Sequence, residues 1–162
     1  AVRDNGFFVG EYAPAPYAGI WVYTGTGNHS LVVGEIVDVV GIYKEYYDLS
    51  EIDVPAAEAY GQALGAGMWT GDLVPLEVSA SVYAADPEPY EGCYIKITDG
   101  MMVYEASNNY GEWTAESMDA PGMFVTFDDY FFDPIALAVG DCFDGATGCL
   151  TYSFGNVKAI YR

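Results

Sequence analysis

The chain has 162 residues, of which 52% are hydrophobic and 16% aromatic, so it can bury a core and is not a disordered tail. Twenty-four Asp and Glu face five Lys and Arg, a formal net charge of −19, which argues against partners such as nucleic-acid phosphates or anionic membranes. No apolar run approaches the roughly 18 residues of a membrane-spanning helix. Frequent Tyr, Val and Ile separated by Gly and Pro predict an all-β protein.

The first half of the chain reads as a series of strands. We expect a strand stub at 1–5, strands at 7–12 and 19–24, a long strand at 32–47 that bends near Gly41, and a shorter return at 49–54. Residues 55–71 read as Ala/Gly-rich connecting sequence, within which 56–68 is the one stretch that could hold a short helix. Residues 73–82 alternate again and predict a bridging strand.

The second half repeats this order. We expect a long strand at 93–105 with a kink at Asp99-Gly100, strands at 112–116 and 122–127, an acidic aromatic loop at 128–137, and a closing element at 139–160. Val33-Gly34-Glu35 matches Val139-Gly140-Asp141, and Gly41-Ile42-Tyr43 matches Gly148-Cys149-Leu150 after a one-residue insertion. The sequence therefore predicts two OB-fold-like β-barrels in tandem, one in residues 1–72 with its connector and one in residues 73–162 with the bridging strand.

Four segments of the second half suggest a family: 89–98 (PYEGCYIKIT), 110–113 (YGEW), 140–143 (GDCF) and 147–158 (TGCLTYSFGNVK). Together with 6–9 (GFFV) and 46–52 (YYDLSEI) in the first half, they resemble the OB-like module that accompanies the catalytic domain of secreted bacterial extracellular endonucleases and related surface proteins. The resemblance covers nearly the whole chain and implies a non-catalytic module. Family members commonly have an apolar residue where Cys93 and Cys149 stand here.

The first barrel lacks most of strand one, since Ala1-Val2-Arg3 is only the tail of that strand. A barrel without strand one leaves open edges. We expect the gap to be filled by residues 73–82 of this chain, by upstream sequence of the parent chain, or by a strand from a neighbouring subunit. If a neighbour fills it, the contact is head-to-tail and can propagate into a filament.

Catalytic and metal-binding patterns are weak. The only histidine, His29, lies in a Gly-flanked turn and reads as an ordinary surface residue, so no catalytic residue is assigned. No cofactor is predicted. Asp128, Asp129 and Asp133 could supply oxygen ligands for weak Ca²⁺ binding, although polar turn residues are the simpler reading and no EF-hand spacing is present.

Aromatic and cysteine residues supply the remaining candidates. The aromatics that could stack on a ligand or on another subunit are Trp21, Tyr23, Tyr43, Tyr46 and Trp113, although part of this set belongs in a core. Strands one and four of an OB barrel pair antiparallel, so Cys93 and Cys149 are candidates for a disulfide. Cys142 and Cys149 are a rival pair if a bend separates them. Asn28 begins an N-glycosylation sequon, Asn28-His29-Ser30.

These observations lead to one leading hypothesis and one rival. The β-rich, Tyr-rich and Lys-poor composition predicts a secreted protein. We expect a non-catalytic building block of an extracellular or cell-surface assembly, with copies of this chain as partners in a homo-oligomer or a filament completed by strand sharing. The alternative is a ligand- or nucleic-acid-binding accessory module of a secreted nuclease, against which the net charge argues.

Overall fold

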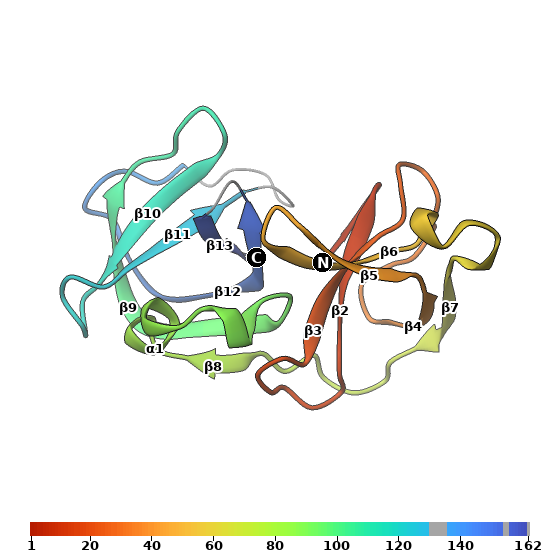
Figure 1. Ribbon diagram of the computed structural model, residues 1–162. Helices are drawn as coiled ribbons and strands as arrows, with labels where there is room; N and C mark the ends of the chain where they lie inside the picture. Colours follow the sequence, from red (N-terminus) through yellow and green to blue (C-terminus); the bar gives the residue numbers. More distant parts are fainter. Residues whose placement is uncertain (130–135, 154–155, 162) are drawn as a thin grey trace.

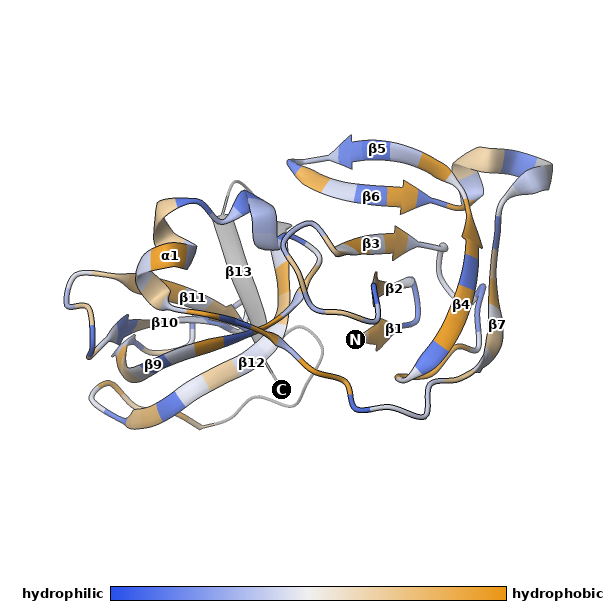
Figure 2. Ribbon diagram, turned by 90° about the horizontal axis from the view of Figure 1, so that it is seen from below, coloured by the Kyte–Doolittle hydropathy of each residue, from blue (hydrophilic) through white to orange (hydrophobic). Residues whose placement is uncertain are grey.

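The computed structural model describes residues 1–129, 136–153 and 156–161 (Figure 1). The prediction of an all-β protein is confirmed, since strands dominate and the one described α-helix, α1, covers only Ala80–Ala85. Two groups of strands lie side by side, the first half of the chain in one and the second half in the other (Figures 1 and 2). We call them the first and the second unit.

The second unit contains five strands whose ladders return to the strand on which they began. The strands are β9 (Tyr94–Glu105), β10 (Glu112–Ser117), β11 (Phe124–Asp128), β12 (Cys142–Ser153) and β13 (Asn156–Tyr161). They pair in the circuit β9–β10–β11–β13–β12–β9, and every ladder is antiparallel except β11–β13. Numbered along the unit, this is the order 1-2-3-5-4 expected for an OB-like barrel.

The first unit uses the same order but does not complete the circuit. Its sheet runs β1 (Val2–Arg3), β2 (Gly6–Gly10), β3 (Gly19–Tyr23), β6 (Leu49–Asp53) and β5 (Ile42–Tyr46), and β3–β6 is again the parallel ladder. The expected long strand is interrupted at Gly41, where an added Cβ would lie 2.4 Å from Ile52 Cγ2, so the close approach there leaves no room for a side chain. Its first part, β4 (Glu35–Val40), leaves this sheet and pairs antiparallel with β7 (Gln62–Met68).

Three local predictions are wrong. Residues 55–71 are not a plain connector, since they hold the 3₁₀ turn η1 (Pro55–Tyr60) and then β7. The expected helix within 56–68 is therefore limited to that turn. The expected strand at 73–82 is shortened to β8 (Leu76–Val78), because Ser79 caps α1 by accepting a hydrogen bond from the Val82 N–H. A second 3₁₀ turn, η2 (Glu88–Tyr90), leads into β9.

The main hydrophobic core belongs to the second unit. Every member of the described core cluster lies between Val78 and Leu150, and Phe127, Ile95, Ile97 and Met101 are among its largest fully buried side chains. Trp113 stacks on Phe127 with ring centroids 4.3 Å apart. Among the described residues of the first unit, the buried hydrophobic side chains are Phe7, Trp21 and Val22. The second unit thus has the larger hydrophobic core, and the first unit buries fewer hydrophobic side chains.

Candidate functional site

Two separate segments share the strand-one role in the first unit. In the second unit β9 pairs with both β10 and β12, that is, with strands two and four. In the first unit β1 pairs with strand two, whereas β7 pairs with the β4 part of strand four. Among the described residues no ladder joins β1 to β7. The strands of the first unit therefore do not close into a barrel, and we call the gap between β1 and β7 the open seam. The segment beside β4 is Gln62–Met68 rather than the expected 73–82.

The expectation for residues 73–82 as the filling strand is wrong because β8 belongs to the second unit. Leu76 pairs with Ile95 and Val78 with Ile97, in a parallel ladder on the edge of β9. Val78 is buried in the second-unit core and Leu76 packs against that core. The apolar alternation correctly predicted a strand at 76–78. Its apolar side chains, however, pack in the core of the second unit and not in the gap of the first.

In the β4–β7 ribbon (Glu35–Val40 with Gln62–Met68), β7 is exposed at nearly every residue and β4 is largely half-buried. The inner face of the ribbon carries the half-buried Val37 and Val39, while Leu64 on its outer face is 56% exposed. At its end the exposed side chain of Tyr12 stacks on Trp69, with ring centroids 4.7 Å apart, and the Trp69 N–H donates to the Gly34 carbonyl. The ribbon is thus fixed at one end and presents apolar side chains to solvent along its length.

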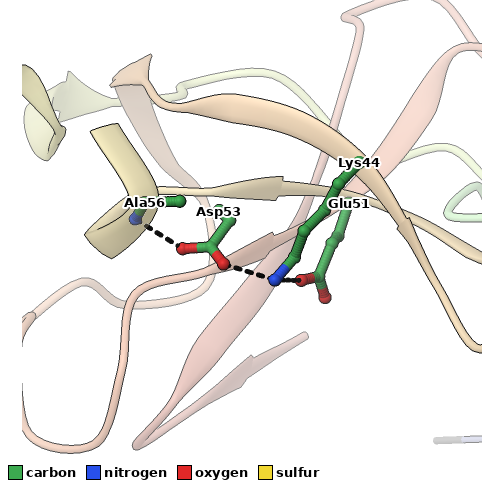
Figure 3. Close-up of polar contacts among 4 residues, drawn as sticks. All are labelled: Lys44, Glu51, Asp53 and Ala56. Carbon is green, nitrogen blue, oxygen red and sulfur yellow. Dashed lines mark hydrogen bonds and ion pairs between the residues drawn. The ribbon is translucent and has the colours of Figure 1, made fainter. Parts of the chain in front are cut away.

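A buried ion cluster fixes the hairpin β5–β6, at the end of the first-unit sheet opposite to β1 (Figure 3). Lys44 Nζ lies 3.2 Å from Glu51 Oε1 and 2.5 Å from Asp53 Oδ2. The second oxygen of Asp53 accepts a hydrogen bond of 2.8 Å from the Ala56 N–H in the first turn of η1. Two carboxylates, 3% and 6% exposed, thus share one half-exposed ammonium group.

The pKa directions follow from this geometry. Burial raises the pKa of Glu51, and the hydrogen bond and charge of Lys44 offset that rise only in part. Burial also pushes the pKa of Asp53 upward, but the Lys44 hydrogen bond, the Ala56 N–H and the Lys44 charge together hold it below its ordinary value. The hydrogen bond to Asp53 raises the pKa of Lys44. The cluster stabilises a charged hairpin, and we assign it a structural role.

The five candidate aromatics do not form one surface. Trp21 and Trp113 are buried and Tyr23 is half-buried, so these rings belong largely to the packing of the two units. Tyr43 and Tyr46 are exposed on β5, where the Tyr43 hydroxyl hydrogen-bonds to Glu45 and thereby has a raised pKa. Tyr46 packs edge-on against Tyr47. Only the β5 pair remains available to a ligand or another subunit.

All three cysteines are free thiols in the structure, so the disulfide stays a prediction. Cys149 pairs with Tyr94, the residue after Cys93, so the expected antiparallel contact of strands one and four is confirmed. Burial raises the pKa of both the Cys93 and the Cys149 thiol. Cys142 is exposed and lies on the same strand as Cys149, which puts the two roughly 20 Å apart at about 3.3 Å per residue and argues against the rival pair.

The acidic candidates are not brought together as ligands. Asp128 is buried at the end of β11 and Asp129 is half-buried, whereas Asp133 lies outside the described residues. Within the described part of the chain no group of three or more His, Cys, Asp or Glu side chains could hold a metal ion. Weak Ca²⁺ binding that involves Asp133 therefore stays a prediction.

The sequon lies on an exposed turn of the first unit. The Asn28 side chain is exposed and its Nδ2 donates to the Thr24 carbonyl. His29 contacts the Arg3 carbonyl through Nε2 at 2.6 Å and packs edge-on against Phe7. Glycosylation at Asn28 stays a prediction, and His29 has structural partners on both sides of its ring.

The two units meet through backbone and through a buried carboxylate. The Tyr17 N–H donates to the Pro89 carbonyl at 2.6 Å, and the Ser50 N–H donates to Glu91 Oε1 at 3.2 Å. Glu91 is buried, and this burial raises its pKa. The junction therefore positions the β5–β6 hairpin against the start of β9.

Comparisons with known families, with curated proteins and with solved structures found no match. The structure itself defines an all-β protein in which the second unit has an OB-like circuit of strands and the first has an open seam. No helix among the described residues is long and apolar enough to cross a membrane.

Sequence reasoning missed β7 as the segment at the seam. The absence of proline and of charge between Gly61 and Met68 is the one signal that could have indicated a strand there.

Proposed function

We propose that this chain is a non-catalytic secreted module that serves as a building block of an extracellular or cell-surface assembly, with other copies of the chain as partners. The observation that carries the proposal is the open first unit, whose β4–β7 ribbon exposes apolar side chains beside a seam that no described ladder closes. Sheet edges and apolar faces of this kind are the usual places at which another chain adds.

The uneven distribution of core residues supports an interaction role. Apolar side chains exposed in the first unit and its connector include Val32, Val33, Val40, Leu64, Met68, Leu73 and Val74. Burying apolar area contributes about 25 cal/mol per Å², so covering several of these side chains would favour association. Contiguous apolar surface on soluble proteins commonly marks interaction sites, and the apolar side chains of the β4–β7 ribbon, Val40, Leu64 and Met68, belong to one two-stranded sheet.

Two side chains that could perform chemistry, Lys44 and His29, have structural partners instead. Lys44 is held between two carboxylates, and His29 lies between Phe7 and the Arg3 carbonyl. A general acid or base needs a free position next to a substrate. These arrangements support a non-catalytic module.

The exposed tyrosines of β5 favour a second candidate, a ligand-binding accessory module. Tyr43, Tyr46 and Tyr47 offer aromatic surface on the β5–β6 hairpin. Base stacking on such rings usually occurs in a positively charged groove. Here the nearest described cation is Lys44, which Glu51 and Asp53 already neutralise, so electrostatics favours the assembly over a nucleic-acid ligand.

Sedimentation velocity across protein concentration tests the proposal. We expect association that grows with concentration and is stronger at about 0.5 M than at about 0.05 M NaCl, because salt screens the repulsion between chains of charge −19. Monomers at every concentration and salt would overturn it. A parallel filter-binding assay with single-stranded DNA at low salt separates the two candidates, since micromolar or tighter binding would favour the accessory module.

A further inference from the structure

The free edge of β7 differs from the other sheet edges in its charge. Described strands that end a sheet are β1, β5, β8, β4 and β7. Charged side chains occur on the first four, namely Arg3 on β1, Lys44 and Glu45 on β5, Glu77 on β8, and Glu35 and Asp38 on β4. The strand β7 (Gln62–Met68) carries none. Charged residues on an edge strand normally prevent pairing with another chain, so β7 lacks that protection.

The backbone of β7 has one paired side and one available side. One side forms the ladder with β4, from Val40–Gln62 to Glu35–Met68. Along the other side, no strand pairs with β7 in the part of the chain that the structure describes. Figures 1 and 2 both show β7 on the outside of the first unit, at the end away from the second unit. Its outward N–H and C=O groups are therefore accessible to another extended strand.

A bulge limits the stretch that can pair. Val37 lies opposite Gly65 and Ile36 opposite Gly67, which leaves Ala66 as the extra residue. A bulge bends the strand locally, so the regular stretch of β7 is 62–65. Leu64 lies in the middle of that stretch, on the exposed face of the ribbon and directly opposite Asp38.

Electrostatics makes the same edge the favourable point of contact between copies. Two chains of charge −19 repel each other, and the repulsion is greatest where acidic surfaces face each other. The edge strand itself carries only Gln, Ala, Leu and Gly over 62–65, so its backbone can approach another without desolvating a charged side chain of β7. The nearest carboxylates, Asp38 and Glu35, belong to the neighbouring strand β4, on the paired side of β7. A strand is also complementary to itself when two copies run antiparallel.

We propose that β7 pairs antiparallel with β7 of a second copy of this chain, so that two β4–β7 ribbons join into one four-stranded sheet. Both copies use the same strand, so the contact is isologous and closes on a pair. This inference rests on the proposed assembly function and identifies one of its contacts. A larger assembly needs a second contact elsewhere on the chain.

The test uses a lysine on the edge strand and a matched lysine elsewhere. Leu64→Lys places a charge on β7, and Ile42→Lys places the same charge on the edge strand β5. The two side chains are 56% and 49% exposed. Each new lysine also lies opposite an aspartate of its own ladder, Asp38 for residue 64 and Asp53 for residue 42. Near-identical thermal unfolding of both variants and the parent chain checks that the fold is retained.

Sedimentation equilibrium and hydrogen exchange then give two independent readouts. We expect Leu64→Lys to weaken pair formation at least about tenfold while Ile42→Lys leaves it within about twofold of the parent chain. We also expect the amides of 62–65 to become more protected from exchange at high protein concentration, with no such change at 42–46.

The outcomes separate the inference from the proposed function. Association that survives Leu64→Lys, with exchange at 62–65 independent of concentration, would overturn the β7 contact and leave the assembly function standing. A parent chain that stays monomeric at every concentration would overturn both. If both lysine variants dissociate equally, the effect comes from general charge and the β7 contact is wrong.

Discussion

Gly19 of the first unit and Gly92 of the second approach each other so closely that neither has room for a side chain. A Cβ added to Gly19 would lie 2.4 Å from the Gly92 carbonyl oxygen, and one added to Gly92 would lie 2.6 Å from the Ile20 Cα. Backbone atoms cannot move aside as a flexible side chain would. The contact therefore fixes the position of the two units relative to each other.

Gly19→Ala should destabilise the protein by about 1–3 kcal/mol, because the new methyl group overpacks a backbone contact. Thermal or urea unfolding measures the change. Gly10→Ala is the matched control, since Gly10 pairs with Gly19 in the β2–β3 ladder and its Cβ would meet only the Ala18 carbonyl at 3.2 Å. We expect the control to stay within about 0.5 kcal/mol of the parent chain. Equal effects of both substitutions would contradict the proposed role of the Gly19–Gly92 contact.

Lys44→Met should cost about 1–3 kcal/mol at neutral pH, because it leaves the buried carboxylates of Glu51 and Asp53 without their cation. Lys96→Met removes a comparable lysine whose partner, Glu77, is exposed, and it should cost no more than about 0.5 kcal/mol. Chemical unfolding at pH 7 and pH 4 gives the comparison. The Lys44 effect should shrink at the lower pH as carboxylates take up protons, and a cost that grows there would contradict this account.

The pKa of Glu91 predicts a pH-dependent contribution at the junction. Burial raises that pKa above the unfolded value near 4.5, so the ionised carboxylate opposes folding at pH values above the folded pKa. This opposition disappears as the pH falls from the folded pKa towards 4.5. Glu91→Gln keeps an oxygen for the Ser50 N–H and should raise the melting temperature at pH 7, with a smaller difference at pH 4. A lower melting temperature at pH 7 would show that the ionised form is the stabilising one.

The cysteines should differ sharply in reactivity. Cys142 is exposed, whereas Cys93 and Cys149 are buried and their thiol pKa values are raised by that burial. Brief alkylation of the native protein should label Cys142 first, and Cys93 and Cys149 should react only after unfolding if they are free thiols, or only after reduction if they form the predicted disulfide. Peptide mass spectrometry without reduction completes the test: a Cys93–Cys149 linked peptide would confirm the predicted disulfide, and labelling of all three thiols after unfolding would exclude it.

Much of the strand order could be predicted because alternating apolar residues mark half-buried strands. Residues 94–105 show this pattern, with the buried Ile95, Ile97, Met101 and Val103 on one face, and Gly41 marks the bend between β4 and β5. The strand β7 escaped prediction because its Gly and Ala residues, apart from the half-buried Ala63, are exposed and show no apolar alternation. Its pairing depends on the empty place beside β4, which is a tertiary effect.

Other features could not be read from local patterns. Lys44, Glu51 and Asp53 form a cluster only because the β5–β6 register puts Lys44 opposite Glu51. The helix α1 was missed because the alternation from Val74 to Val78 suggested a longer strand, although Ser79 followed by alanines is a helix start that local reasoning can recognise. The β4–β7 ladder joins two segments that are more than twenty residues apart in the sequence, so no local pattern predicts it.

Electron microscopy of the concentrated protein tests the central claim most directly. If the chain is a building block of an assembly, images should show paired or larger particles, and Leu64→Lys should reduce them while Ile42→Lys should not. Fields of monodisperse monomers from the parent chain, at concentrations well above those used for sedimentation, would contradict the account.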